Sequence, residues 1–324
     1  MNRRLFIENT LKFGTALSVL GFSTSLIDMQ EPPRNKLFFK LSLAQWSLHK
    51  AILESKMLSP MDFAEKARVL GFEGLEYVSQ MYPLEKGNEK ASLDKIITEL
   101  TFRSSDNEMQ NVLIMVDDEG ELAALSKNER NDAVNSHSKW IDAAAALGCH
   151  SIRVNLFGKD AEHDFNQWKE TASDGLRKLS ELAAKSNINV IVENHGGLSS
   201  DAGKLLHVIQ NVNMKNCGTL PDFGNFCTKR EGGERWSGDC IEKYDKYKGV
   251  AEMLPFAKGV SAKSYDFDFA GNETTIDYVK MLKAVKDSGY TGFIGVEYEG
   301  NRLVEEQGIE ATKKLLIQAA SKLD

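Results

Sequence analysis

The amino-acid sequence predicts a single-domain α/β fold, the (β/α)8 or TIM barrel, and three observations support this. After residue 36, short apolar segments alternate eight times with longer segments of helical periodicity. Such alternation is typical of βαβ units that form a parallel sheet. Eight units within residues 37–324 fit a closed barrel better than an open sheet. The turn after the first expected strand, at 45–49, also lacks the Gly-rich phosphate loop of open nucleotide-binding sheets.

The expected strands are apolar runs, many of them rich in β-branched residues, at 37–46, 73–78, 112–116, 150–155, 188–193, 217–221, 259–263 and 292–297. The expected helices carry apolar side chains at helical spacing and cover 59–70, 91–102, 129–147, 165–186, 202–212, 239–256, 275–288 and 308–323. Ser59 and Pro60 suit the start of a helix, and Gly148 suits a helix end. The polar segment 228–238 has three glycines and a tryptophan, and it is either a mobile lid or a plain surface loop.

Residues 1–30 are expected to be an export signal outside the fold, followed by a linker at 31–36. Arg3 and Arg4 precede a charge-free run at 13–27, which is too short to span the ~30 Å hydrocarbon core of a bilayer comfortably. Residues 2–7 resemble a twin-arginine signal. That resemblance implies export of the folded protein to the periplasm, with no stable membrane insertion after signal removal. An N-terminal helix or membrane anchor is the alternative.

The composition excludes several classes of protein. A hydrophobic content of 42% is that of a folded chain rather than a disordered one. The net charge of −7 comes from 47 acidic and 40 basic residues spread along the chain, so no basic stripe predicts nucleic-acid binding. Cys149 and Cys217 are expected to be buried thiols. Cys227 and Cys240 share one loop, where an oxidising compartment would permit a bridge.

Polar and charged residues gather at the carboxyl ends of the expected strands, which is where the active site of such a barrel lies. Four of them are acids from different strands, namely Glu76, Glu193, Asp222 and Glu297. Because apolar surroundings disfavour charge and like charges repel, such a group needs a cation or a polar substrate nearby. Oxygen ligands suit Mg²⁺ or Mn²⁺, and an added imidazole favours Mn²⁺, Co²⁺ or Zn²⁺. The sequence therefore predicts a divalent metal as cofactor.

Three of these strand ends carry motifs that resemble a known family. Residues 192–197 read Val-Glu-Asn-His-Gly-Gly, residues 220–225 read Leu-Pro-Asp-Phe-Gly-Asn, and residues 295–299 read Gly-Val-Glu-Tyr-Glu. They are similar to the sugar phosphate isomerase/epimerase family of xylose-isomerase-like barrels, and the resemblance covers about residues 37–320. It implies one divalent metal, held by a histidine together with Glu193, Asp222 and Glu297.

The histidine that the resemblance implies is missing. The family's His-x-Lys-Asp pattern on the seventh strand reads Ser-Ala-Lys-Ser at 261–264, and its Asp-x-x-His pattern reads Asp-Phe-Gly-Asn at 222–225. In the first of three interpretations, the three carboxylates hold metal with water or substrate in the open positions. In the second, His195 supplies the imidazole, because it lies two residues beyond Glu193 on the same strand face. In the third, the ammonium of Lys263 takes over the electrostatic role of the metal.

The predicted function is a metal-dependent sugar isomerase or epimerase that acts on a small-molecule carbohydrate. By resemblance, Glu193 and Glu297 serve both as metal ligands and as the acid/base pair that moves a proton at the carbon next to a carbonyl. Lys263 is the third catalytic candidate. A lyase or dehydratase of oxidised sugars is the nearest alternative, and a non-catalytic carbohydrate-binding barrel with a decayed metal site is another. The sequence leaves the oligomeric state open, a homo-oligomer included.

Further residues at strand ends and in the following loops are candidates for substrate binding: Trp46, His49, Glu76, Asn155, His195 and Asn225. Several candidates also have a structural interpretation. Glu76 could pair with Arg153 across the barrel, and Lys263 could simply neutralise Glu297. Asp222 could cap the turn that follows it. Trp46 and His49 could form part of the wall by packing.

Overall fold

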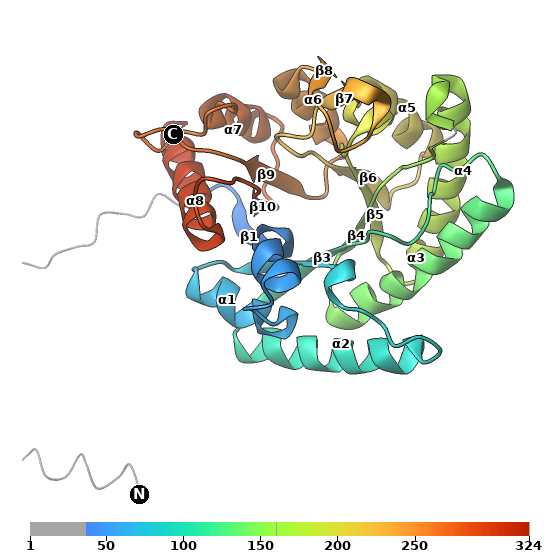
Figure 1. Cartoon of the computed structure of the whole chain (residues 1–324), viewed down its shortest axis with the longest axis horizontal. Coiled ribbons are helices and arrows are strands. Elements are labelled where there is room, and N and C mark those ends of the chain that lie inside the picture. Colours follow the sequence, from blue (N-terminus) through green and yellow to red (C-terminus); the bar gives the residue numbers. More distant parts are fainter. Residues whose placement is uncertain (1–36, 160, 324) are drawn as a thin grey trace, which may run out of the picture. The chain divides into compact units, whose positions relative to one another are not determined.

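The structure of the protein is a computed structural model that describes residues 37–159 and 161–323. The predicted export signal and linker, residues 1–36, lie outside these residues. Within them, parallel strands occupy the centre and helices cover their outer side (Figure 1). Among the described helices, none combines the length and the apolar character that crossing a membrane requires.

Eight strands of the described residues form one parallel sheet in the spatial order β6-β5-β4-β3-β2-β1-β10-β9. They are β1 (Lys40–Ala44), β2 (Gly74–Val78), β3 (Gln110–Met115), β4 (Ser151–Val154), β5 (Asn189–Glu193), β6 (Cys217–Leu220), β9 (Val260–Ser264) and β10 (Phe293–Tyr298). β9 and β6 are joined by a bridge between Asp222 and Ser261, and the Ser261 N–H donates to the carbonyl of Pro221 at 2.9 Å. The sheet therefore closes, which confirms the predicted (β/α)8 barrel.

The helices alternate with these strands. They are α1 (Phe63–Val69), α2 (Glu89–Asp106), α3 (Lys127–Leu147), α4 (Phe165–Ala184), α5 (Ala202–Val212), α6 (Lys246–Met253), α7 (Tyr278–Asp287) and α8 (Glu305–Ser321). Ser59 accepts a hydrogen bond from the Met61 N–H as a helix cap, and Gly148 ends α3 with a φ of 76°. Trp168 and Leu176 of α4 are fully buried on the side that packs on β5. Amphipathic periodicity thus predicted where most helices lie.

One region differs from the prediction. The predicted helix over 239–256 is wrong in its first part, because β8 (Cys240–Lys243) pairs in antiparallel fashion with β7 (Cys227–Arg230). α6 starts later, at Lys246, where the side chain of Asp245 caps it by accepting a hydrogen bond from the backbone. Pairing between two segments separated by a loop decides the structure here, and helical periodicity does not detect such pairing.

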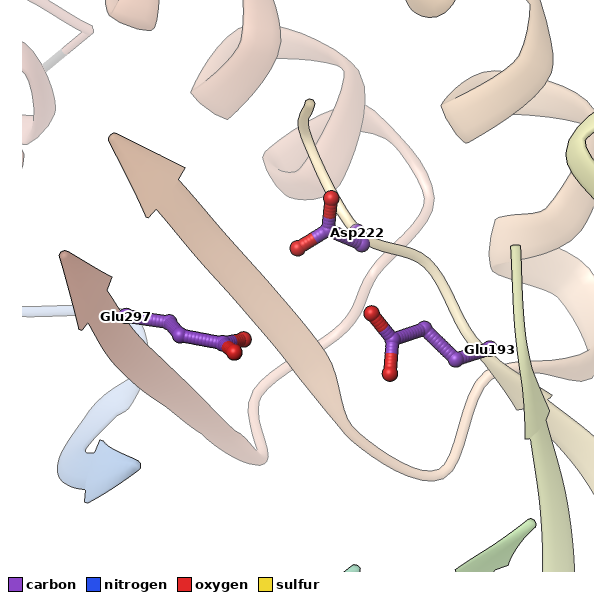
Figure 2. Close-up of side chains that lie close together, drawn as sticks. All are labelled: Glu193, Asp222 and Glu297. Carbon is purple, nitrogen blue, oxygen red and sulfur yellow. The ribbon is translucent and has the colours of Figure 1, made fainter. Parts of the chain in front are cut away.

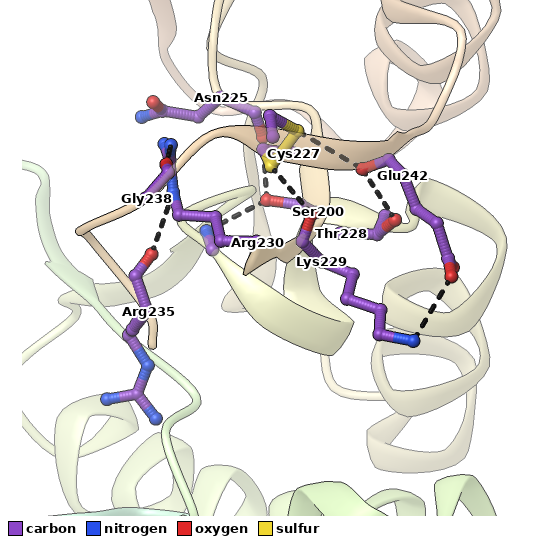
Figure 3. The surroundings of a disulfide bond; sticks show 11 residues. Ser200, Asn225, Cys227, Thr228, Lys229, Arg230, Arg235, Gly238 and Glu242 are labelled. Carbon is purple, nitrogen blue, oxygen red and sulfur yellow. Dashed lines mark hydrogen bonds and ion pairs between the residues drawn. A yellow bond between two sulfur atoms is a disulfide. The ribbon is translucent and has the colours of Figure 1, made fainter. Parts of the chain in front are cut away.

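A disulfide joins the two strands of this hairpin. It links Cys227 and Cys240, whose Cα atoms are 5.9 Å apart (Figure 3). This is the bridge that the sequence permitted. Cys149 and Cys217 are free and buried, as expected, and burial raises the pKa of the Cys217 thiol to about 11. The four cysteines thus divide into one cross-link and two buried thiols.

Candidate active site

Three acids meet at the carboxyl ends of their strands. Glu193 is the last residue of β5, Asp222 follows β6 by two residues, and Glu297 lies in β10. One carboxylate oxygen of each lies within 4.8 Å of those of the other two, and all three side chains are buried. Figure 2 shows the three carboxylates pointing toward one another. We call Glu193, Asp222 and Glu297 the carboxylate cluster. The barrel assembles it because parallel strands end at the same rim.

The serine that replaces the implied histidine lies inside this cluster. The hydroxyl of Ser261 is 2.7 Å from Oδ2 of Asp222 and 2.8 Å from Oε2 of Glu297, so it can donate to one of them at a time. The other oxygen of Asp222 accepts the N–H groups of Gly224 and Asn225, both at 2.8 Å. Asp222 therefore caps the following turn and faces the cluster at once, so its structural and functional interpretations are compatible.

Two buried cations face the cluster from opposite sides. The ammonium of Lys263, which is 1% exposed, lies 3.0 Å from Oε1 of Glu297 and 3.1 Å from Oε1 of Glu299. It is also 3.9 Å from Oδ2 of Asp222. On the other side, Nε of Arg153 is 3.1 Å from Oε2 of Glu193, in ion-pair contact but without hydrogen-bond alignment. Lys263 thus neutralises Glu297, as its structural interpretation proposed, and it also lies near Asp222 of the cluster.

These two cations do not balance the buried negative charge. Burial raises the pKa of Glu193 to about 7, against the partial opposition of Arg153. Burial likewise raises the pKa of Asp222 to about 8, and the neighbouring Glu193 and Glu297 add to the increase. Burial opposes the charged form of Lys263, but Glu297 and the other surrounding carboxylates raise its pKa well above the usual value. A further cation among the carboxylates would reverse the first two shifts.

The residues of the cluster fit a divalent metal. Carboxylate oxygens are ligands that hard cations prefer, and the raised pKa values of Glu193 and Asp222 show that burial disfavours their charged forms, which a bound cation would stabilise. Within the described residues, the candidate ligand group consists of Glu193, Asp222 and Glu297 and contains no histidine. His195 instead places Nδ1 2.7 Å from Oδ1 of Asn155. Burial lowers the pKa of His195 to about 4. This geometry favours the three-carboxylate interpretation over an imidazole ligand.

Two amides near the cluster hold its backbone and side chains in place. Nδ2 of Asn194 donates to the carbonyls of Asp222 and Asn225, both at 3.1 Å, and its Oδ1 accepts the Asp222 N–H at 2.8 Å. Nδ2 of Asn225 donates to Oε1 of Glu193 at 2.9 Å. Asn225 was predicted to bind substrate, and the structure shows that it also orients Glu193.

A cavity of about 740 Å³ opens at this rim of the barrel. Of the sequence-predicted site residues, its walls include Trp46, Asn155, His195, Asn225 and Glu297. Sequence reasoning missed further wall residues from the loops, namely Phe157, Arg235, Trp236 and Tyr265. The tryptophan in the polar segment 228–238 was the only signal for these, and it did not distinguish a lid from a surface loop.

Two predicted substrate contacts, Glu76 and His49, do not lie on the cavity wall. Glu76 is buried inside the barrel, where the Ser42 hydroxyl donates to its Oε1 at 2.6 Å. Burial raises its pKa to about 8. Its suggested pairing with Arg153 is replaced by a bond from Nη1 of Arg153 to Asp117 at 2.8 Å. His49 packs on the ring of Trp46, with centroids 4.7 Å apart. Its Nδ1 lies 2.7 Å from the Trp46 carbonyl, and this contact holds the His49 ring against Trp46 and off the cavity wall.

A closed parallel barrel with a buried acid cluster at the carboxyl ends of its strands is the arrangement of an α/β-barrel enzyme. The chain belongs to the xylose isomerase-like TIM barrel family, which it matches over residues 64–318. No curated protein matches the sequence. The fold is nevertheless shared with several solved structures.

Three of these structures show which kinds of protein share the fold. The E. coli 3-keto-D-glucoside 4-epimerase YcjR is 14% identical, with a TM-score of 0.63, and the match covers 86% of this chain and 98% of that one. The IOLI protein, solved with a bound zinc atom, is 14% identical, with a TM-score of 0.64 and coverage of 88% and 99%. The probable 3-DHS dehydratase AsbF of Bacillus anthracis is 18% identical, with a TM-score of 0.61 and coverage of 86% and 98%. At these identities the likeness shows the fold alone.

Proposed function

We propose that this protein is a divalent-metal-dependent sugar isomerase or epimerase. The observation that carries the proposal is the carboxylate cluster, whose three acids lie within 4.8 Å of one another with too little positive charge around them. The names of similar structures agree with it, since one is a sugar epimerase and another holds zinc. The ligands would be Glu193, Asp222 and Glu297, and Mn²⁺, Mg²⁺, Co²⁺ and Zn²⁺ are the candidate metals.

The two glutamates would carry the proton transfer. Glu193 and Glu297 come from different strands and approach the centre of the cluster from two sides (Figure 2). One carboxylate removes a proton from the carbon next to the sugar carbonyl, and the other returns a proton to the opposite face. Burial raises the pKa of Glu193 in the metal-free protein, and a bound cation would lower it again and favour the carboxylate form that accepts the proton. A bound divalent cation would polarise the carbonyl.

The buried cations would position these acids. The ammonium of Lys263 holds Glu297 at 3.0 Å, and the guanidinium of Arg153 holds Glu193 at 3.1 Å. Lys263 itself is buried and does not belong to the cavity wall, but its partners Glu297 and Glu299 do. Lys263 therefore serves the proposed reaction by holding these two carboxylates in place.

Metal analysis and isotope exchange test the proposal together. Protein purified with added Mn²⁺ should retain about one metal per chain, and Asp222→Asn should abolish that retention. In D₂O, a panel of ketoses should contain at least one sugar that gains deuterium next to its carbonyl. Glu193→Gln should slow this exchange by ~10²-fold or more, as loss of a general base does. If the protein retains no metal and exchanges no proton in any sugar of the panel, the proposal is contradicted. A non-catalytic carbohydrate-binding barrel is then the remaining interpretation.

A dehydratase is the second candidate, because one of the similar structures is a probable dehydratase. The same removal of a proton next to a carbonyl can expel a β-hydroxyl group instead of leading to reprotonation. Mass spectrometry of the products separates the two candidates, since an epimerase conserves the mass of the sugar and a dehydratase lowers it by one water.

We also propose that the protein is exported to the periplasm. The twin-arginine-like text at residues 2–7 supports this, and the disulfide between Cys227 and Cys240 suits an oxidising compartment. Cells without the twin-arginine translocase should retain the protein in the cytoplasm, and so should Arg3→Lys combined with Arg4→Lys. Normal export in both cases would contradict the proposal and indicate a general secretory signal or an anchor.

A further inference from the structure

The hairpin of β7 and β8 brings two large side chains to the cavity. Arg235 and Trp236, from the loop between its strands, both line the cavity wall. The guanidinium of Arg230 braces this loop by donating to the carbonyls of Arg235 at 3.1 Å and Gly238 at 3.0 Å (Figure 3). A Cβ at Gly196 would lie 3.2 Å from Arg235 and 3.3 Å from Trp236. The glycine therefore allows the hairpin to rest closely on the loop that follows β5.

The hairpin completes an aromatic surface next to the reaction centre. The ring of Trp236 lies 4.6 Å from that of His195 and 6.0 Å from that of Phe157, measured between centroids. The guanidinium of Arg235 stacks 3.8 Å from the Phe157 ring and pairs with Glu162 at 3.0 Å. We call Phe157, His195, Arg235 and Trp236 the aromatic platform. Although Trp236 lines the cavity, 54% of it is exposed, so much of its ring surface is open to a ligand.

The aromatic platform is linked to the carboxylate cluster but distinct from it. Contacts run along the wall from Glu193 to Arg153 at 3.1 Å and from Arg153 to Asn155 at 3.3 Å. They continue from Asn155 to His195 at 2.7 Å, and the His195 ring meets Trp236. Glu193 and Trp236 are thus linked through Arg153, Asn155 and His195. A ligand that meets both Glu297 and Trp236 would extend along this wall, which both residues line.

The size of the cavity agrees with such a ligand. Its volume of about 740 Å³ lies within the ~300–1,000 Å³ that is typical for ligands of drug size, which have many more atoms than one hexose. A single sugar ring at the carboxylate cluster would leave much of this volume to water. A second ring fits the chemistry of the platform, because the C–H face of a pyranose packs on an aromatic ring while its hydroxyls bond to charged side chains.

We propose that the aromatic platform is a second sugar-binding subsite, and that the substrate is a glycoside or disaccharide with its reacting ring at the carboxylate cluster. The part that concerns the reacting ring rests on the proposed function. The second ring packs on Trp236, and its hydroxyls reach Arg235 and the exposed cavity residue Asp118. A glycosidic bond uses the anomeric carbon of one ring only, so where the reacting ring supplies that carbon, its carbonyl lies on another ring carbon.

Calorimetric titration tests the subsite without requiring turnover. Glucose, cellobiose and maltose are titrated into the full exported protein. At least one disaccharide should bind about tenfold more tightly than glucose, and Trp236→Ala should remove this difference without weakening glucose binding. Trp236→Phe should retain most of the difference, because it keeps an aromatic face. Phe102→Ala is the matched control, since Phe102 is 62% exposed on the outer helix α2 and lies away from the cavity wall.

Two outcomes would overturn the subsite. One is that neither disaccharide binds more tightly than glucose to the unmodified protein. The other is that Trp236→Ala weakens glucose and disaccharides equally, with an unchanged melting temperature. Failure of the proposed reaction is a separate result, since it is the absence of deuterium exchange, whereas the titration measures binding and requires no exchange. A protein that prefers disaccharides but exchanges no proton would support the subsite and contradict the proposed isomerase or epimerase activity.

Discussion

The carboxylate cluster, which reaches the cavity wall through Glu297, and the aromatic platform, which lines that wall, are held in different ways. The cluster is buried, stands at the ends of three barrel strands, and has several polar contacts to each acid. The platform depends on a hairpin outside the barrel sheet, with an exposed tryptophan and one disulfide. The barrel thus supplies the rigid charge arrangement that the proposed chemistry needs. The appended hairpin supplies the surface that can select a ligand, and it can change without disturbing the barrel.

The largest effect should come from breaking the charge balance of the cluster. Lys263→Met keeps the apolar stem but leaves Glu297 and Glu299 without their buried cation. In metal-free protein, urea unfolding should show a loss of about 3–5 kcal/mol, because removal of one partner exposes the cost of the buried charge. Turnover should fall as well, by ~10²-fold, since Lys263 orients Glu297.

A surface lysine provides the control for this change. Lys283→Met breaks an exposed pair with Asp287 and should cost less than about 1 kcal/mol. If Lys263→Met has an equally small effect on unfolding but a large effect on turnover, Lys263 is catalytic and contributes little to holding the cluster together. A destabilised protein with near-normal turnover would instead refute its catalytic role.

Removing the disulfide should affect the platform more than the cluster. Cys227→Ser combined with Cys240→Ser opens a link between residues 13 apart and should lower the unfolding free energy by up to about 3 kcal/mol. The disaccharide preference should decrease, because the hairpin that carries Trp236 loses its cross-link. Metal retention should be unchanged, since the three ligands belong to the barrel. Loss of metal in the folded double variant would show that the two regions are not independent.

The last prediction concerns the charge of Glu76, which is buried inside the barrel near the carboxylate cluster. Burial raises the pKa of Glu76 from 4.5 to about 8, so the folded protein binds this proton where the unfolded chain has lost it. The contribution is zero below about pH 4.5, and it becomes destabilising as the pH rises to about 8. Glu76→Gln should therefore raise the stability of metal-free protein more at pH 8 than at pH 5, and flatten its pH dependence.

Chemical denaturation of both proteins at pH 5 and pH 8 checks this prediction. Glu193 and Asp222 also have raised pKa values, so the variant should retain part of the decline toward pH 8. Identical curves for Glu76→Gln and the unmodified protein would mean that Glu76 is charged in the fold and has found a partner other than Ser42.

The agreement between sequence and structure is closest where local pattern and barrel symmetry coincide. Glu193 and Glu297 could be identified from the sequence because apolar strands ending in an acid are rare, and parallel strands in a closed barrel end at one rim. The same reasoning placed Glu76 at the rim, but the structure puts it inside the barrel. There Gly295 leaves room for its carboxylate, whose oxygens would lie 2.5 Å from a Cβ at that position. This space depends on a neighbouring strand, which the sequence around Glu76 does not reveal.

The sequence by itself determined the alternation of strands and helices and the closed barrel, because both follow from local periodicity and from the common direction of parallel strands. It also gave four acids at strand ends, and the resemblance to a known family singled out Glu193, Asp222 and Glu297 among them. Only the tertiary structure decided what surrounds those acids. Ser261 bonds to two of them, and Lys263 faces Glu297 rather than solvent. It also decided that Trp236 meets His195, which depends on a cross-link within the hairpin and on the small size of Gly196. Contacts of this kind join residues from separate elements, and no local pattern in the chain specifies them.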